Sequence, residues 1–277
     1  MAFELIAFDM DGTLLDSNKE VLPSSIEAVE EAVSAGKIVA ISSGRVPRMV
    51  KPYREVLPGV RYAVCGAGAQ VYDFEAVRAL ITHPMDPSLV EKCIAAADEA
   101  AGAGNYVLEV GDEEASILQT SELALCGVCG VGVYEGIFRS TGKLVDDVHA
   151  IALDPATPVC KMVMHLPEVE QRDRVHAALA HEELMISDCE VSSIEFTAAG
   201  VNKGSALTEL AQALGLKMSQ VIAVGDAMND ISMLRAAGLG VAMGNAIPAT
   251  VAAADVQVAD CDHDGCAEAI HRFLLAE

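Results

Sequence analysis

The stretch LIAFDMDGTLL, residues 5–15, joins a short apolar segment to two aspartates that are two residues apart. The apolar segment predicts a buried β-strand, and Asp9 and Asp11 follow at its carboxyl end. Side chains two residues apart in an extended chain face the same way, so both carboxylates should project from the edge where open α/β sheets bind ligands. Two adjacent carboxylates repel each other unless a cation lies between them. Taken alone, the stretch is equally compatible with a solvated acidic turn and with a cation-dependent site.

Predicted strands and helices alternate on both sides of this stretch. The predicted strands are residues 3–8, 37–41, 62–65, 220–224, 239–243 and 256–258. Helical patterns separate most of these strands, and successive β-α-β units form a parallel sheet with right-handed crossovers. The sequence therefore predicts an α/β fold with a Rossmann-like parallel-sheet core.

The middle of the chain has a different pattern. Helices are predicted at residues 88–101 and 169–180, and shorter strands at segments such as 106–110 and 160–166. Strands accompanied by few helices favour a small α+β domain with an antiparallel sheet. We therefore expect a core made of residues 1–83 and 187–277, with an α+β domain inserted at residues 84–186.

Composition and charge exclude several classes of protein. Hydrophobic residues make up 52% of the 277 residues, which is enough to bury a substantial core and excludes a disordered chain. Asp and Glu number 41 against 18 Lys and Arg, for a formal net charge of −23. Such an acidic surface repels phosphate backbones and anionic membranes, so we expect no nucleic-acid or membrane partner. The first residues, MAFELIAF, lack the basic segment of a signal peptide, and the cysteines are scattered as in reduced proteins, so we expect a cytoplasmic protein.

A second acidic cluster follows another predicted strand. In GDAMND, residues 225–230, Asp226 lies just past the apolar segment 221–224. Asp226 could complete a site for a hard cation with Asp9 and the backbone carbonyl of Asp11. Oxygen ligands of this kind suit Mg²⁺, which usually keeps several waters and takes substrate phosphate as a further ligand. The two clusters together therefore favour a magnesium site.

Two further motifs lie between these clusters. SSGR, residues 42–45, ends the second predicted strand, and Lys203 opens a predicted helix within NKG, residues 202–204. Ser43 alone fits a helix cap, and Lys203 alone fits a surface lysine. A hydroxyl and an ammonium delivered beside carboxylates are, however, what a bound phosphoryl group needs. Four motifs in this order, each at a strand end or a helix start, favour a phosphoryl site.

In their order and spacing, these motifs resemble those of the haloacid dehalogenase (HAD) superfamily. The matching residues are DMDGTLL at 9–15, SSGR at 42–45, NKG at 202–204 and GDAMNDISML at 225–234. The resemblance is closest to the Cof-like phosphatases with a type IIB cap, because the insert between the second and third motifs has the length of that cap. It implies a Rossmann-like catalytic core, a cap domain at the insert, and Mg²⁺-dependent chemistry through an aspartyl-phosphate.

The resemblance also implies a role for each motif residue. Asp9 would be the nucleophile, and Asp11 would protonate the leaving group and then deprotonate the attacking water. Mg²⁺ would be held by Asp9, by Asp11 through its carbonyl, and by Asp226. Contacts to phosphate or substrate would come from Ser43, Gly44, Lys203 and Asn229, with Asp230 supporting Lys203 or a metal-bound water. Arg45 would lie beside the site, where it would either attract the substrate anion or form part of a solvated helix face.

The leading prediction is a Mg²⁺-dependent phosphatase of small phosphorylated metabolites, such as sugar phosphates. A phosphomutase or phosphotransferase of the same superfamily is an alternative, because an aspartyl-phosphate can be passed to a sugar hydroxyl. A module that signals through a phosphorylated aspartate fits less well, since such receivers are far shorter and lack an acid–base aspartate two residues after the phosphorylated one. The physiological substrate, the specificity residues of the cap and the oligomeric state are left open.

Two cysteine-containing segments have no assigned role. Many relatives carry Asn-Gly-Ala after the third strand, where this chain has Cys65, Gly66 and Ala67. Cysteine cannot supply the hydrogen bonds of an amide, so the contacts of that asparagine are left open. Cys126 and Cys129 have the spacing of metal ligands but lack an obvious second pair, which argues against a zinc site.

Overall fold

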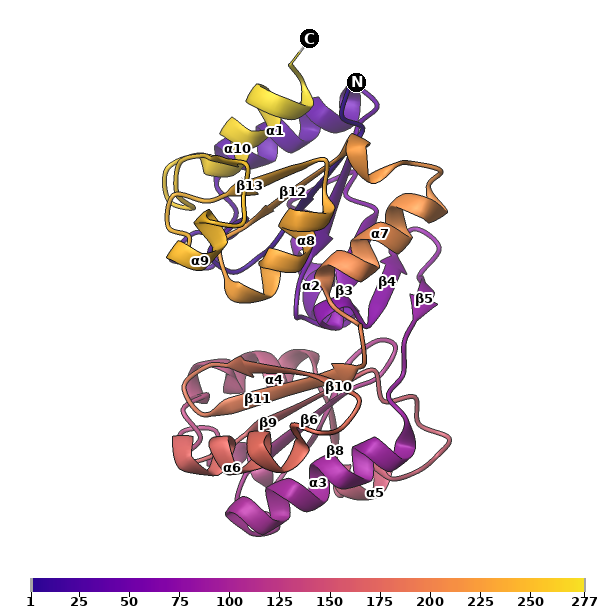
Figure 1. Cartoon of the computed structure of the whole chain (residues 1–277), viewed down its shortest axis with the longest axis vertical. Coiled ribbons are helices and arrows are strands. Elements are labelled where there is room, and N and C mark those ends of the chain that lie inside the picture. The colour runs from indigo at the N-terminus through magenta and orange to yellow at the C-terminus, as the bar shows by residue number, and fades with distance from the viewer. Residues whose placement is uncertain (1, 277) are drawn as a thin grey trace. The chain divides into compact units, whose positions relative to one another are not determined.

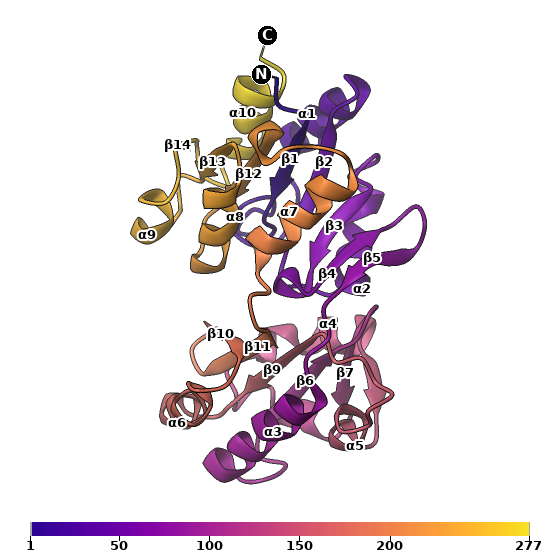
Figure 2. The same ribbon diagram turned by 45° about the vertical axis from the view of Figure 1, so that its right-hand side comes forward.

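The computed structural model describes residues 2–276, and the chain divides into two compact units. The first unit contains the chain up to Arg45, the segment Val50–Ile81 and the chain from Asn202 onward. The second unit contains Val46–Met49 and Thr82–Val201. In Figures 1 and 2 the beginning of the chain, in indigo to purple, and its end, in orange to yellow, build the first unit, and the middle, from magenta to the salmon and orange of β10 and β11, builds the second.

An eight-stranded sheet forms the centre of the first unit, in the order β14-β13-β12-β1-β2-β3-β4-β5. Its strands are β1 (Leu5–Phe8), β2 (Ile38–Ser42), β3 (Tyr62–Cys65), β4 (Gln70–Asp73), β5 (Arg78–Thr82), β12 (Val221–Gly225), β13 (Leu239–Ala242) and β14 (Val256–Gln257). The strands from β14 to β3 in this order pair in parallel, whereas β3 and β4 pair antiparallel. The predicted parallel α/β core is therefore confirmed, with an antiparallel pair added toward one edge.

Helices cover both faces of this sheet. They are α1 (Pro23–Ser34), α7 (Lys203–Ala213), α8 (Ile231–Ala236), α9 (Pro248–Val251) and α10 (Gly265–Ala269), together with short 3₁₀ helices η1 (Lys51–Glu55), η2 (Gly66–Gly68), η5 (Met218–Gln220) and η6 (Met228–Asp230) and the π-helical turn η7 (Ile270–Leu274). The short helix α2 (Pro47–Val50) is not one of them, because its residues up to Met49 group with the second unit. Alternate residues of β1 join different hydrophobic cores. Ile6 and Phe8 pack with residues of α1, α10 and η7, whereas Leu5 and Ala7 pack with residues of α7 and α8. By this alternation, the next residue, Asp9, lies on the face of α7 and α8.

The second unit has a six-stranded sheet in the order β10-β11-β9-β6-β7-β8. Its elements are α3 (Pro87–Ala101), β6 (Val107–Gly111), β7 (Ser116–Gln119), η3 (Glu122–Leu125), η4 (Gly132–Tyr134), α4 (Glu135–Thr141), β8 (Lys143–Val145), α5 (Val148–Ala152), β9 (Lys161–His165), α6 (Val169–Leu179), β10 (Leu184–Cys189) and β11 (Ser193–Ala198). All its strand pairs are antiparallel except β7 and β8, which are parallel. The unit has its own hydrophobic core, to which α3 and α6 contribute, as expected of an α+β domain.

The boundaries of the second unit differ from those predicted from the sequence. β10 and β11 form an antiparallel hairpin that extends the six-stranded sheet through β9, so this unit continues to Val201 rather than ending at residue 186. The unit also takes in Val46–Met49, where the backbone amide of Arg48 donates to the carbonyl of Glu114 at 2.8 Å. The sheet that a strand joins is decided by its pairing partners, which the local pattern of that strand does not reveal.

No helix within residues 2–276 is both long and apolar enough to cross a membrane. Within residues 2–276 no cysteine forms a disulfide. Cys126 and Cys129 are buried in a hydrophobic cluster of the second unit, together with Leu123 and Phe138.

Candidate active site

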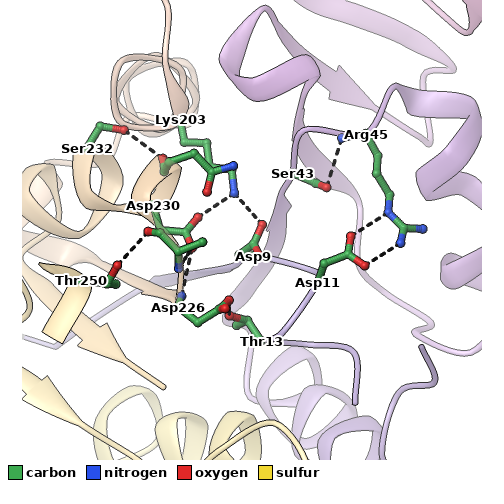
Figure 3. A network of polar contacts seen from close by, with 12 residues as sticks. Asp9, Asp11, Thr13, Ser43, Arg45, Lys203, Asp226, Asp230, Ser232 and Thr250 are labelled. Atoms are coloured by element: carbon green, nitrogen blue, oxygen red, sulfur yellow. Dashed lines mark hydrogen bonds and ion pairs between the residues drawn. The ribbon is translucent and has the colours of Figure 1, made fainter. Parts of the chain in front are cut away.

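Asp9 extends β1 by one residue at the carboxyl edge of the sheet. Its backbone amide donates to the carbonyl of Val224 in β12 at 3.0 Å, which fixes the chain next to the central strand pair. The residue is only 5% exposed. Figure 3 shows its carboxylate pointing toward Lys203, so the strand delivers this group into the interior of the first unit rather than to solvent.

Lys203 is the buried cation of the site. Its Nζ atom donates to Oδ1 of Asp9 at 2.5 Å and to Oδ1 of Asp230 at 2.6 Å, and the residue is 1% exposed. Asn202 caps α7 through its side chain, which accepts from the amides of Gly204 and Ser205, and so fixes where Lys203 starts the helix. Burial opposes the charge of Lys203, but the two carboxylates outweigh it and raise the pKa of this ammonium.

Asp230 holds the turn that follows β12. Its Oδ2 atom accepts hydrogen bonds from the backbone amides of Asp226 and Ala227, each at 2.9 Å, while its Oδ1 atom accepts from Lys203. The carboxylate is thus engaged at both oxygens and is fully buried. Asp230 therefore links Lys203 to the turn that carries Asp226, and the supporting role implied for it by the resemblance stays a prediction.

Asp226 faces the turn that carries Asp9. The hydroxyl of Thr13 donates to its Oδ1 atom at 2.8 Å. Gly12 has a φ of +83°, and a Cβ atom at this position would lie 2.6 Å from Oδ2 of Asp226. Only glycine combines that backbone conformation with this close approach, so Gly12 lets the two acidic segments meet.

Three carboxylates gather around this point. Asp9, Asp226 and Asp230 each place one oxygen within 4.8 Å of the others, an arrangement that could hold a metal ion. Burial, and then the charge of Asp230, raise the pKa of Asp9 to about 7, and burial also raises the pKa of Asp226. Because Asp230 is already engaged at both oxygens, Asp9 and Asp226 are the better candidates for metal ligands. An oxygen-only donor set with an excess of negative charge fits Mg²⁺.

The carboxylate of Asp11 binds two cationic side chains rather than the other carboxylates. Arg45 donates from Nε to Oδ2 of Asp11 at 3.1 Å and from Nη2 to Oδ1 at 2.9 Å, and Nζ of Lys19 donates to Oδ1 at 2.8 Å. Figure 3 shows the guanidinium and the carboxylate facing each other. Burial alone would raise the pKa of Asp11, but the hydrogen bonds and charge of Arg45, aided by Lys19, lower it. Asp11 is therefore held as a carboxylate.

Residues 6–270 match the haloacid dehalogenase-like hydrolase family, a span that includes every part of this site. The chain belongs to the haloacid dehalogenase-like hydrolase family. The predicted superfamily is therefore confirmed, and so is the predicted class of enzyme, a HAD-type phosphatase.

Individual relatives of this HAD-like hydrolase support the assignment. Pyridoxal phosphate phosphatase YbhA of Escherichia coli is 33% identical to it, over 99% of this chain and 100% of the relative. A solved HAD-like hydrolase from B. subtilis is 26% identical to this chain and superimposes with a TM-score of 0.83. The match covers 98% of this chain and 100% of the B. subtilis chain. A solved sugar phosphatase of HAD subclass IIB has the same fold, with 23% identity, a TM-score of 0.77 and coverage of 99% and 100%.

The remaining predicted residues of the HAD-like site occupy different surroundings. Ser43 is buried directly after β2, and its hydroxyl accepts a hydrogen bond from the amide of Arg45 at 3.2 Å. Gly44 is half-buried in the same turn. Asn229 is exposed, and its backbone carbonyl accepts from the hydroxyl of Ser232 at 3.5 Å. The substrate contacts predicted for Ser43, Gly44 and Asn229 remain predictions.

Three residues of the HAD-like site were not predicted from the sequence. They are Thr13, Lys19 and Asn245, whose side-chain amide donates to the carbonyl of Gly12 at 2.8 Å. Thr13 could have been found, because it adjoins the DMDG motif and carries a hydroxyl. Lys19 and Asn245 lie in loops, where no periodic pattern indicates the direction of a side chain.

The helix that begins with Lys203 packs closely against its neighbour at Gly204. We therefore expect alanine at this glycine and alanine at a second helical glycine, Gly136, to have different effects on stability. A Cβ atom at Gly204 would lie 2.3 Å from the carbonyl oxygen of Ser232, whereas one at Gly136 in α4 would meet nothing within 4 Å. Gly204→Ala should therefore destabilise the protein by ~1–3 kcal/mol through overpacking. Gly136→Ala should stabilise it by up to ~1 kcal/mol, because alanine favours a helix. Urea unfolding of both variants measures this, and equal effects would contradict the close approach of α7 and α8.

Proposed function

We propose that this chain is a Mg²⁺-dependent phosphatase that hydrolyses small phosphorylated metabolites through an aspartyl-phosphate on Asp9. The observation that carries the proposal is the buried contact between Asp9 and Lys203, placed beside Asp226 at the carboxyl edge of the sheet. A carboxylate in such a position can attack phosphorus, and a buried ammonium can stabilise the phosphoryl oxygens as negative charge develops on them.

Each residue has a defined task in the proposed reaction. Asp9 forms the bond to phosphorus, and Lys203 keeps one of its oxygens fixed while balancing the negative charge. Asp9, the carbonyl of Asp11 and Asp226 would hold Mg²⁺, which when bound screens the nucleophile from the anionic substrate. Asp230 keeps Lys203 in place and orders the amides that precede η6. Ser43 contributes a hydroxyl to the phosphoryl group.

Asp11 moves protons in both halves of the proposed reaction. As an acid it protonates the leaving oxygen, and as a base it accepts a proton from the water that hydrolyses the aspartyl-phosphate. The structure holds Asp11 in its ionised form, which is the form required in the second half. Protonation in the first half therefore requires its contact with Arg45 to loosen.

The proposed substrates are small organic phosphate monoesters, with pyridoxal phosphate as the first to test. The relative from Escherichia coli that is 33% identical is named a pyridoxal phosphate phosphatase, and it aligns along its full length. Phosphate release should be measured with the purified chain on pyridoxal phosphate, several hexose phosphates and flavin mononucleotide, with Asp9→Asn protein as the blank. Transfer of phosphate to an added sugar, in place of its release, would support a phosphotransferase instead.

Metal removal is expected to abolish this activity. Excess EDTA should reduce phosphate release to background, and added Mg²⁺ should restore it, because the carboxylate cluster needs a cation to admit an anionic substrate. Asp226→Ala should raise the Mg²⁺ concentration needed for half-maximal activity. In EDTA the same variant should be at least as thermally stable as the wild type, because it lacks one carboxylate of a repelling cluster. Full activity after verified metal removal would contradict the proposal.

A further inference from the structure

All three nitrogens of the Arg45 guanidinium donate hydrogen bonds, and one of these bonds goes to a residue outside the four sequence motifs. Nε and Nη2 bind the two oxygens of Asp11, while Nη1 donates to the hydroxyl of Tyr53 at 3.1 Å. The carbon at the centre of the guanidinium also lies 5.3 Å from the centre of the Tyr53 ring. Arg45 is thus held on one side by Asp11 and on the other by Tyr53.

Tyr53 is itself fixed by the core of the first unit. It belongs to η1 (Lys51–Glu55) and packs, partly buried, against the hydrophobic core that contains β1 and β2 residues. The side chain of Arg45 is 14% exposed, so its contacts with Asp11 and Tyr53 are only weakly screened by solvent. Because the planar guanidinium of Arg45 is bound on both sides, it keeps one orientation. Its two hydrogen bonds to Asp11 then fix the orientation of that carboxylate.

The contact between Arg45 and Tyr53 closes a loop of the chain. The intervening residues Val46–Met49 belong to the second unit, whereas Arg45 and Tyr53 belong to the first. Without a contact across the base of this loop, the position of Arg45 would depend on Val46–Met49, which packs with the second unit. The hydroxyl and ring of Tyr53 provide that contact.

We propose that Tyr53 is a positioning residue for phosphate hydrolysis, acting through Arg45 to fix the carboxylate of Asp11. The proposal rests on the proposed function, because Asp11 must accept the proton of the attacking water. Two oxygens held by one guanidinium define the plane of the carboxylate. Because Oδ1 also accepts from Lys19, the second lone pair of Oδ2 is the one that would accept the proton of the water. Tyr53 acts on Asp11 through Arg45, so we expect its effect to fall on the rate of turnover rather than on substrate binding.

Kinetics of Tyr53→Phe test this assignment, because the variant keeps the ring and removes only the hydroxyl. It should lower kcat by ~3–10-fold with KM nearly unchanged, since a small displacement of a proton-transfer group slows the reaction. Tyr62→Phe is the matched control. The centre of the Tyr62 ring lies 5.0 Å from the guanidinium of Arg61, which binds Asp73 at two points, so this pair repeats the contact of ring, guanidinium and carboxylate away from the site. Tyr62→Phe should leave kcat unchanged.

A double-mutant cycle separates positioning from a merely structural role. In the Asp11→Asn background, Tyr53→Phe should cause no further loss of kcat, because the residue it positions is no longer a base. An equal loss in both backgrounds would show that Tyr53 acts through general packing and would overturn the proposal, as would a Tyr53→Phe enzyme with the kcat of the wild type.

A measurement that needs no turnover distinguishes failure of this proposal from failure of the proposed function. The NMR signal of the Arg45 Nε–H group, assigned by its absence in Arg45→Lys, should shift in both Tyr53→Phe and Asp11→Asn but not in Tyr62→Phe. If the wild type releases no phosphate while these shifts occur, the proposed function fails and the linkage of Tyr53, Arg45 and Asp11 stands. An Arg45 signal that is unchanged in Tyr53→Phe overturns the linkage itself.

Discussion

Replacing Asp9 with asparagine should stop phosphate release from every substrate, with a loss in kcat of ~10⁴-fold or more. An amide oxygen is a poor nucleophile, and in the proposed reaction the oxygen of Asp9 forms the bond to phosphorus. The fold should survive, because asparagine has the same shape and its oxygen can still accept the hydrogen bond from Lys203. Phosphate release and thermal unfolding of the same preparation measure both effects.

Asp73→Asn is the matched control for this prediction. Asp73 is also a buried aspartate of the same sheet, in β4, and Arg61 binds it at 2.7 and 3.0 Å. Its replacement should lower the melting temperature without changing kcat, because it breaks an ion pair that lies outside the reaction. Substantial turnover by Asp9→Asn, or phosphate trapped on another residue of the wild type, would show that Asp9 is not the nucleophile.

Replacing Asp11 with asparagine should produce a loss that depends on the leaving group. An alkyl phosphate leaves as a strong base and needs protonation, so its hydrolysis should slow by ~10²–10⁴-fold. An aryl phosphate with an acidic phenol needs little help, so the first step should largely survive. The water that attacks the aspartyl-phosphate would still lack its base. Rapid-quench kinetics should therefore show a burst of phenol of up to one equivalent, and intact mass should show phosphorylated protein.

Asp16→Asn controls for disturbance of the same loop. Asp16 accepts hydrogen bonds from the backbone amides of Asn18 and Glu20, which hold the turn that carries Lys19. It should show no burst and no dependence on the leaving group. Equal losses for alkyl and aryl substrates in Asp11→Asn, with no trapped phosphoprotein, would mean that Asp11 does not transfer the protons.

The parallel core and the central carboxylates could be predicted because each depends on a local sequence pattern that indicates one structure much more strongly than any other. Short apolar runs separated by amphipathic helices specify β-α-β units, and residues directly after such strands must meet at one edge of the sheet. Asp9 and Asp226 follow neighbouring parallel strands, so their proximity follows from strand order. Lys203 joins them because it begins a helix packed on the same face.

The contacts of loop residues could not be predicted in the same way. Lys19 reaches Asp11 from a turn, and Tyr53 reaches Arg45 from a 3₁₀ helix that contains Pro52. Proline lacks the amide that a regular helix would use, and this shortens α2 and redirects the chain. The predicted boundary after residue 186 divides β10, because the sequence does not reveal that β10 and β11 pair as a hairpin and extend the sheet of the second unit through β9.

The strand order of the first unit has a consequence for the synthesis of the protein on the ribosome. β1 lies between β2 and β12, but β12 is made only after the whole segment Thr82–Val201 has been translated. Until then the nascent chain carries Asp9 on an open sheet edge, without Lys203 or Asp226, while the middle of the chain already has a complete sheet with its own hydrophobic core. A product that ends directly before Asn202 would therefore contain all of the middle unit together with an exposed, inactive part of the first sheet, a form that we expect chaperones and proteases to recognise.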